Sequence, residues 1–131
     1  MFTISRRFAI AATLATALMS NPALAQDLTG TLKKIKDTGA ITLGHRESSI
    51  PFSYYDDKQQ VIGYSQEMML KAVDAIKAEL KLAKLDIKLM PVTSENRITL
   101  VQNGSVDLEC GSTTNTTERQ KQVSFSNSIF V

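Results

Sequence analysis

Residues 65–90 of the chain read SQEMMLKAVDAIKAELKLAKLDIKLM, and this stretch decides the fold class. Its apolar side chains recur with the period of an amphipathic helix, at Met68, Met69, Ala72, Val73, Ile76, Leu80 and Ala83. Ser65 is suited to cap that helix, because its hydroxyl can accept from a first-turn N–H group. Residues 86–90 then alternate polar and apolar side chains, which predicts a strand that Pro91 stops.

The same alternation of helix and strand continues on both sides of this stretch. We predict helices over residues 29–36 and 96–102, and strands over residues 40–44 and 106–111. Residues 52–55 and 61–63 flank a polar turn and predict a hairpin. Residues 112–117 are expected to form a loop, and residues 123–125 to begin another extended segment. This order indicates an α/β fold, a mostly parallel sheet with helices on both faces.

The first 25 residues have the composition of a secretory signal peptide. Arg6 and Arg7 precede an apolar stretch, residues 8–19, that is too short to span a bilayer. Residues 23–25 read Ala-Leu-Ala, a small-x-small cleavage pattern. We therefore expect cleavage after Ala25 and export, which leaves residues 26–131 as one small domain.

Charge and composition exclude several classes of function. The chain has 15 Lys and Arg and 13 Asp and Glu, and the loss of Arg6 and Arg7 leaves 13 of each sign. A protein that binds nucleic acid needs a basic surplus, so we expect no nucleic-acid partner. His45 and Cys110 are the only residues of their types, without metal-ligand spacing. We expect neither a metal site nor a cofactor.

Three polar segments follow predicted strands, at residues 45–49, 93–97 and 112–117. The carboxyl ends of parallel strands meet at one edge of a sheet, so these segments should lie close together. Arg46 and Arg97 offer planar donor groups that match a carboxylate. Arg97 falls in the first turn of a predicted helix, where a bound anion would offset the unfavourable dipole. With the hydroxyls around them, the two arginines predict a site for a small acid with two carboxylates.

Each of these residues also has a structural interpretation. Arg97 could pair with Glu95 or with a surface carboxylate, and Arg46 could form an exposed pair with Glu47. The hydroxyl run could be a loop with capping residues only. The residues alone therefore leave a carboxylate site and a set of ordinary surface pairs as alternatives.

Longer motifs resemble the periplasmic glutamate/aspartate-binding proteins of polar amino acid ABC transporters, which are family 3 solute-binding proteins. The resemblance runs from Leu28 to Val131 and rests on residues 44–55 (GHRESSIPFSYY), 63–65 (GYS), 93–97 (TSENR), 110–115 (CGSTTN), 118–121 (ERQK) and 125–126 (FS). It implies the first lobe of a type II periplasmic binding protein, a monomer that delivers its ligand to an ABC permease in the inner membrane.

The resemblance also implies roles for individual residues. Arg97, Ser112 and Thr114 would hold the carboxylate and amino groups of the ligand. Arg46 and Ser94 would complete the pocket, with Arg46 on the side-chain carboxylate of an acidic amino acid. Arg119 would brace the loop after the hydroxyl run, and Cys110 would pair with a cysteine further along the chain of full-length relatives. The alternative for Cys110 is a buried free thiol.

The chain departs from the family in length, since the family has two lobes and about twice as many residues. We therefore expect a remnant that lacks the second lobe and binds glutamate weakly or not at all. Two further alternatives are a sensor domain and an enzyme of the same fold, such as a dehydratase or a transglycosylase. An enzyme needs a positioned acid or base, and Glu47 and Glu118 are the acids expected beside the site. We therefore expect no catalysis.

Overall fold

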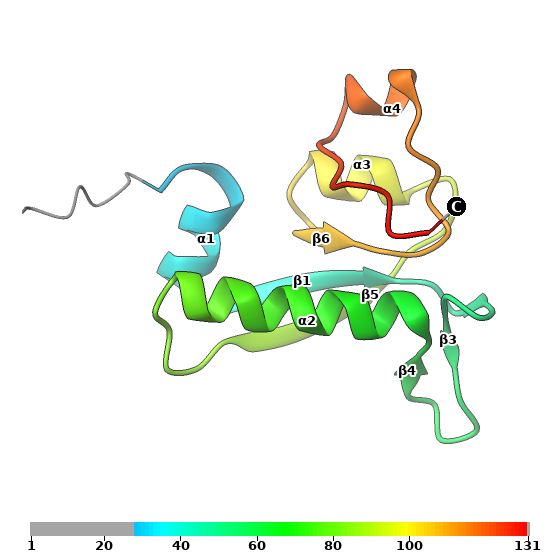
Figure 1. The fold of residues 1–131 in the computed structure, drawn as a ribbon, viewed down its shortest axis with the longest axis horizontal. Helices are drawn as coiled ribbons and strands as arrows, with labels where there is room; N and C mark the ends of the chain where they lie inside the picture. Colours follow the sequence, from blue (N-terminus) through cyan, green and yellow to red (C-terminus); the bar gives the residue numbers. More distant parts are fainter. Residues whose placement is uncertain (1–27, 131) are drawn as a thin grey trace, which may run out of the picture.

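The computed structural model describes residues 28–130, so the predicted signal peptide lies outside the described residues. Helices and strands alternate along the chain in Figure 1. Their bounds are α1 (Gly30–Thr38), β1 (Ala40–His45), β2 (Ser48–Ser49), β3 (Ser53–Tyr55), β4 (Val61–Ile62), α2 (Tyr64–Glu79), β5 (Asp86–Pro91), α3 (Arg97–Gln102), β6 (Leu108–Glu109) and α4 (Thr117–Gln120). In this part of the chain, none of the helices has the length and apolar character needed to cross a membrane.

The main sheet is parallel and has the strand order β5-β1-β6. Leu43 of β1 is in register with Leu89 of β5 on one side and with Leu108 of β6 on the other. Strands β2, β3 and β4 form a separate antiparallel sheet that follows the carboxyl end of β1 (Figure 1). The parallel sheet with its connecting helices confirms the predicted α/β fold.

One face of the main sheet carries the apolar core. Alternate residues of β1 point to this face and meet the apolar side of α2. The buried side chains of the cluster are Ile35, Ile41, Leu43, Met69, Val73 and Leu80. The predicted helical period therefore identified the buried face of α2 correctly at Met69, Val73 and Leu80.

The opposite face of β1 approaches its neighbours more closely. Gly44 points to this face, and a methyl group on it would lie 3.0 Å from Val106 Cγ1, 3.2 Å from Val92 Cγ1 and 3.3 Å from Glu109 Cγ. Val92 precedes α3 and Val106 follows it, so the glycine lets the connections of α3 pack tightly on the sheet. This face is where the charged groups described below are buried.

The start and the end of α2 differ from the prediction. The helix begins at Tyr64 with Gly63 at the N-cap position, and Ser65 does not cap it. The backbone N–H groups of Tyr64 and Ser65 already donate to the carbonyls of Pro51 and Phe52, so the first turn needs no side-chain cap. The helix ends at Glu79, because Lys81 takes a positive φ of 54°, and the predicted apolar position Ala83 is exposed.

Several other predicted features were wrong or incomplete. Ile87 and Leu89 of β5 are 43% and 47% exposed, because β5 is an edge strand and α2 packs against β1. The short elements β2 and α4 were not predicted, and the predicted strand over residues 106–111 is reduced to Leu108–Glu109. Residues 123–125 form no strand within the described chain.

An ion pair between the exposed Lys34 and the buried carboxylate of Asp107 joins α1 to the strand edge. Lys34 Nζ donates to Asp107 Oδ1 at 2.8 Å and to the Gly104 carbonyl at 2.8 Å. Asp107 Oδ2 accepts from the backbone N–H of Thr42 at 2.9 Å, and the Asp107 side chain is only 2% exposed. One carboxylate therefore links α1, β1 and the residues that lead into β6.

We expect Asp107→Ala to lower the free energy of unfolding by about 2 kcal/mol or more, because it leaves the Thr42 N–H without its acceptor and removes the anionic partner of Lys34. Urea denaturation of the substituted and unsubstituted chains measures this difference. Asp37→Ala is the matched control, since it removes an exposed i,i+4 partner of Lys33 on the same helix. It should lower the free energy of unfolding by less than about 0.5 kcal/mol. Equal losses in the two variants would contradict this account.

Candidate anion-binding site

Arg46 stands directly after β1, and its backbone is held by a buried serine. Ser53 Oγ donates to the Arg46 carbonyl at 3.0 Å and accepts from the Arg46 N–H at 2.9 Å. The preceding His45 is also buried and packs edge to face on Tyr55, with ring centroids 5.5 Å apart. These contacts fix the direction in which the Arg46 side chain leaves the sheet.

Arg97 is the first residue of α3 and is almost completely buried, with 5% of its surface exposed. The turn before it is closed by reciprocal hydrogen bonds, in which Thr93 N–H donates to Asn96 Oδ1 and Thr93 Oγ1 accepts from the N–H groups of Glu95 and Asn96. The Nε and Nη1 atoms of Arg97 are buried without a hydrogen-bond partner in residues 28–130. A buried guanidinium with free donors is suited to receive a carboxylate.

Arg97 forms an ion pair with Glu109 of β6. Arg97 Nη1 lies 4.0 Å from Glu109 Oε1, and the two side chains are 5% and 7% exposed. Glu109 Oε2 accepts from Thr113 Oγ1 at 2.8 Å, while Oε1 has no partner within the described residues. The alternative in which Arg97 pairs with Glu95 is therefore wrong, since the ion pair is made with Glu109.

The loop after β6 carries Ser112 and Thr114 and begins at the buried Gly111. Ser65 Oγ donates to the Gly111 carbonyl at 3.2 Å, which ties the start of α2 to this loop. A methyl group at Gly111 would lie 3.0 Å from both Arg46 Cγ and Glu109 Oε1. The glycine therefore leaves room for the stem of Arg46 and the carboxylate of Glu109, which a larger residue would displace by a few tenths of an ångström.

The end of the same loop is fixed by Arg119. Its Nη1 donates to the Thr114 carbonyl at 2.9 Å, and its backbone N–H donates to Thr116 Oγ1 at 3.3 Å. These are the contacts expected of a residue that braces the loop. The Ser112 and Thr114 hydroxyls lie on the exposed part of the loop and form no hydrogen bond with the arginines within residues 28–130.

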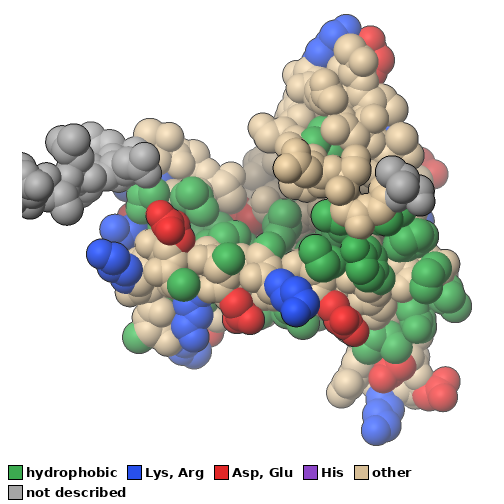
Figure 2. All heavy atoms as spheres, viewed as in Figure 1, with side chains coloured by type: hydrophobic (Ala, Val, Ile, Leu, Met, Phe, Trp, Pro, Cys, Tyr) green, Lys and Arg blue, Asp and Glu red, His purple; other side chains and the backbone are tan. Residues whose placement is uncertain are grey.

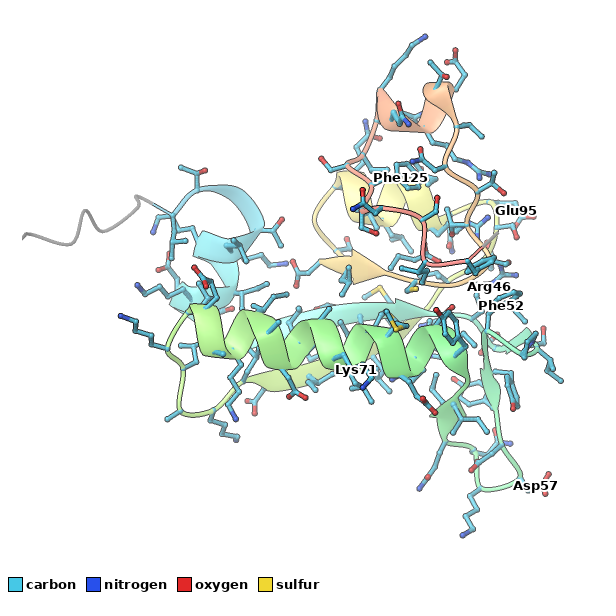
Figure 3. All side chains as sticks on the ribbon, viewed as in Figure 1. Arg46, Phe52, Asp57, Lys71, Glu95 and Phe125 are labelled. Carbon is cyan, nitrogen blue, oxygen red and sulfur yellow. The ribbon has the colours of Figure 1, made fainter. Side chains whose placement is uncertain are left out.

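Ser94 and Glu95 lie in the turn before α3, and Glu95 adds a negative charge near the arginines. Hydrogen bonds with the Thr93 side chain and with its own backbone lower the pKa of Glu95, and the charges of Arg46 and Arg97 lower it further. Figure 3 shows Arg46, Phe52 and Glu95 on the same side of the molecule, away from Lys71 on α2 and from Asp57 in the hairpin turn. Ser94 is exposed beside these charges.

Arg46 thus lies near enough for its charge to act on Arg97, and Ser94, Ser112 and Thr114 lie on loops at the same end of the sheet. Burial lowers the pKa of Arg97, and Glu109 opposes this effect. Burial raises the pKa of Glu109, while the Thr113 hydrogen bond and the charges of Arg97, Arg46 and Arg119 oppose it. This arrangement leaves a partly compensated positive charge, which can bind a small anion.

A cavity of about 440 Å³ lies between the loop after β6 and the C-terminal segment. Residues 109–115 and 125–130 line it, including Ser112 and Thr114 but neither of the arginines nor Ser94. Its rim includes Phe130, which stacks on Phe52 with ring centroids 4.5 Å apart, and Figure 2 shows apolar side chains gathered where the C-terminal segment meets the start of α2. The cavity therefore adjoins the predicted site without coinciding with it.

Glu109 is the residue that the sequence analysis missed, since only Glu47 and Glu118 were expected as acids beside the site. Its signal was present in the strand pattern. Leu108 and Cys110 pack against the core, so the alternation of a strand points Glu109 to the opposite face, three residues before Ser112.

Comparison with known proteins gives a consistent family. The sequence model of the bacterial extracellular solute-binding proteins, family 3, matches residues 41–131. The chain is 61% identical over 115 residues to the L-glutamate/L-aspartate-binding protein of Pseudomonas aeruginosa, which covers 87% of this chain and 38% of that protein. It is 54% identical over 124 residues to the glutamate/aspartate import solute-binding protein of Escherichia coli K12, with 92% and 41% covered. The chain therefore spans about two-fifths of the length of these relatives.

A solved structure supports the fold. Domain 1 from TmArgBP, in an arginine-bound form, superposes with a TM-score of 0.65 at 21% sequence identity, and the match covers 76% of this chain and 71% of that one. At this level of identity the likeness shows the fold alone, which is that of the first domain of a type II periplasmic binding protein.

The raised pKa of Glu109 predicts how stability depends on pH. A carboxyl group with a higher pKa in the folded chain binds its proton more tightly when folded. The stability that it contributes is present below the ordinary glutamate pKa of about 4.3 and is lost as the pH rises through the raised value. We expect the unsubstituted chain to lose stability relative to Glu109→Gln as the pH rises from about 4 to about 7.

Urea denaturation of both chains across this range measures the difference. Glu118→Gln, on the exposed surface of α4, controls for the removal of a carboxylate elsewhere. A stability difference between Glu109→Gln and the unsubstituted chain that does not change with pH would contradict the raised pKa.

Proposed function

This chain belongs to family 3 of the bacterial extracellular solute-binding proteins, and we propose that it is the first ligand-binding lobe of a protein that captures glutamate or aspartate for import. In this proposal the lobe works in the periplasm, as a monomer, and its cognate partner is an ABC permease in the inner membrane. The two relatives are a binding protein for these acids and an import solute-binding protein, which supports the proposal.

The buried guanidinium of Arg97 is the observation that carries the proposal. Two of its donors have no partner in the described chain, and Arg46 adds a second positive charge nearby. A ligand with two carboxylates would satisfy both arginines, because each guanidinium can form two parallel hydrogen bonds with one carboxylate. A neutral amino acid offers one carboxylate only.

Each predicted site residue has a role in this proposal. Arg97 would bind the carboxylate next to the amino group, and Arg46 would bind the side-chain carboxylate. The hydroxyls of Ser94, Ser112 and Thr114 would donate to the carboxylates or accept from the ammonium group, since a hydroxyl can do both. All five residues stand at the carboxyl ends of parallel strands, which is where open α/β sheets bind their ligands.

We propose binding rather than catalysis. Of the acids near the arginines, Glu109 accepts a hydrogen bond from Thr113 and pairs with Arg97, and Glu95 is held by the turn before α3. Neither is placed beside a nucleophile or a base that would orient it for proton transfer. The relatives reported above are binding proteins as well.

We expect the chain alone to bind weakly, with dissociation constants above the micromolar range. The cavity beside the site is lined by neither arginine, and the alignment covers only about two-fifths of each relative. A ligand bound to one lobe keeps much of its surface in water. Its binding free energy is therefore smaller than in a site that encloses it.

Calorimetric titration of the chain with L-glutamate, L-aspartate and L-glutamine tests the proposal. We expect both acids to bind more tightly than glutamine. Arg46→Met should reduce the affinity for the acids to that for glutamine, because it removes the partner of the side-chain carboxylate. Arg97→Lys should weaken all three ligands by about tenfold or more, because an ammonium group cannot reproduce the two parallel hydrogen bonds.

Lys71→Met is the matched control, since Lys71 is an exposed cation on α2 that Figure 3 shows away from Arg46. It should leave all three affinities unchanged. Equal affinities for glutamine and the two acids in the unsubstituted chain would overturn the proposed ligand class.

A further inference from the structure

The Glu109 carboxylate lies among positive charges that come from three different elements. Arg46 follows β1, Arg97 begins α3, and Arg119 lies in α4, and the charges of all three act on Glu109. Arg97 is the arginine in direct ion-pair contact, at 4.0 Å. Glu109 therefore neutralises part of the positive charge of these arginines, which would otherwise act on the proposed ligand without a counter-ion.

The position of this carboxylate is fixed by the structure around it. Glu109 is in register with Gly44, so it points to the same face of the sheet, where the missing side chain of Gly44 leaves room for it. Thr113 Oγ1 donates to Oε2 at 2.8 Å and holds the other oxygen toward Arg97. Gly111 separates Glu109 from the stem of Arg46. A carboxylate held in this way cannot move into solvent without disturbing the site.

The ion pair is incomplete on both sides. Arg97 Nη1 and Glu109 Oε1 are 4.0 Å apart, which is beyond hydrogen-bond distance, and each is buried without another partner in residues 28–130. Arg97 therefore keeps donors that no group within residues 28–130 uses. Glu109 and the ligand would share one guanidinium, and two carboxylates that share a cation repel each other.

The net charge of the group suits a particular ligand. Three arginines and two glutamates give a net charge of +1 when all are ionised, and they are Arg46, Arg97, Arg119, Glu95 and Glu109. An amino acid with two carboxylates and one ammonium carries −1 at neutral pH. Without Glu109 the group would carry +2 and would attract an anionic ligand more strongly, with less effect on a neutral one.

We propose that Glu109 is an internal counter-ion of this site, which shares Arg97 with the carboxylate of the ligand and so limits how strongly the site prefers acidic to neutral amino acids. This inference rests on the function proposed above. Glu109 is a positioning residue in this account, because it acts on the ligand through Arg97.

The first test needs no ligand. Arg97→Gln should destabilise the chain, because it leaves Glu109 buried without its nearest cation. Adding Glu109→Gln should then recover most of the lost stability, whereas Glu118→Gln, which removes an exposed carboxylate from α4, should recover none. Urea denaturation of the single and double variants measures this. Additive effects of Arg97→Gln and Glu109→Gln would show that the two charges are not coupled and would overturn the inference.

The second test measures ligand preference. We expect Glu109→Gln to bind L-glutamate roughly tenfold more tightly, which corresponds to about 1.4 kcal/mol, and L-glutamine with a smaller gain. The ratio of the two affinities, measured by calorimetric titration, should therefore rise. An equal change for both ligands, or a loss of both, would show that Glu109 only supports the fold of the site.

The two proposals fail in different ways. If the unsubstituted chain binds glutamine as tightly as the two acids, the proposed ligand class is wrong, and the ligand-free rescue still decides whether Glu109 is the counter-ion of Arg97. If the acids bind preferentially and the rescue does not occur, the proposed function stands and the inference about Glu109 is wrong.

Discussion

Strand β1 lies between β5 and β6, and its register with both strands determines which side chains share each face of the sheet. Ile41 and Leu43 point toward α2, where the apolar core forms. Gly44 points the other way, toward Val92, Val106 and Glu109. The sheet thus separates an apolar face, which supplies most of the burial, from a face on which charged side chains lie between strand and helix. A shift of one residue in this register would exchange the two faces.

Burial of charge on the second face is unfavourable unless it is compensated, and the structure compensates it only in part. Arg97 and Glu109 are both nearly sealed from water, yet their closest atoms are 4.0 Å apart. Thr113, Gly111 and Arg119 hold the surrounding loop in place through hydrogen bonds and close packing. The site is therefore rigid enough to keep guanidinium donors unpaired, which is a favourable arrangement for a protein that binds an anion reversibly.

Apolar side chains are exposed at the outer parts of the sheet, whereas charged side chains are buried at the site. Ile87 and Leu89 are about half exposed on the edge strand β5, and the edge of β6 away from β1 has no strand beside it within residues 28–130. The core cluster has six buried side chains and is small. Hydrogen bonds to buried groups, such as that from the Thr42 N–H to Asp107, consequently contribute a larger share of the stability than they would in a larger domain.

The sequence by itself determined the order of helices and strands, the buried face of α2 and the segments that carry Arg46, Ser94, Arg97, Ser112 and Thr114, because hydrophobic periodicity and strand-end polar residues are local signals. It also pointed to the family through motifs that extend along most of the chain.

The sequence did not identify Glu109 as the ion-pair partner of Arg97, since the two residues lie on different elements and meet only when β6 pairs with β1. It misplaced the cap of α2, whose first N–H groups find acceptors in Pro51 and Phe52, and it predicted helices on both faces of a sheet whose edge strand β5 leaves Ile87 and Leu89 exposed. Partners of buried charges and the exposure of edge strands depend on long-range pairing, and only the tertiary structure decides them.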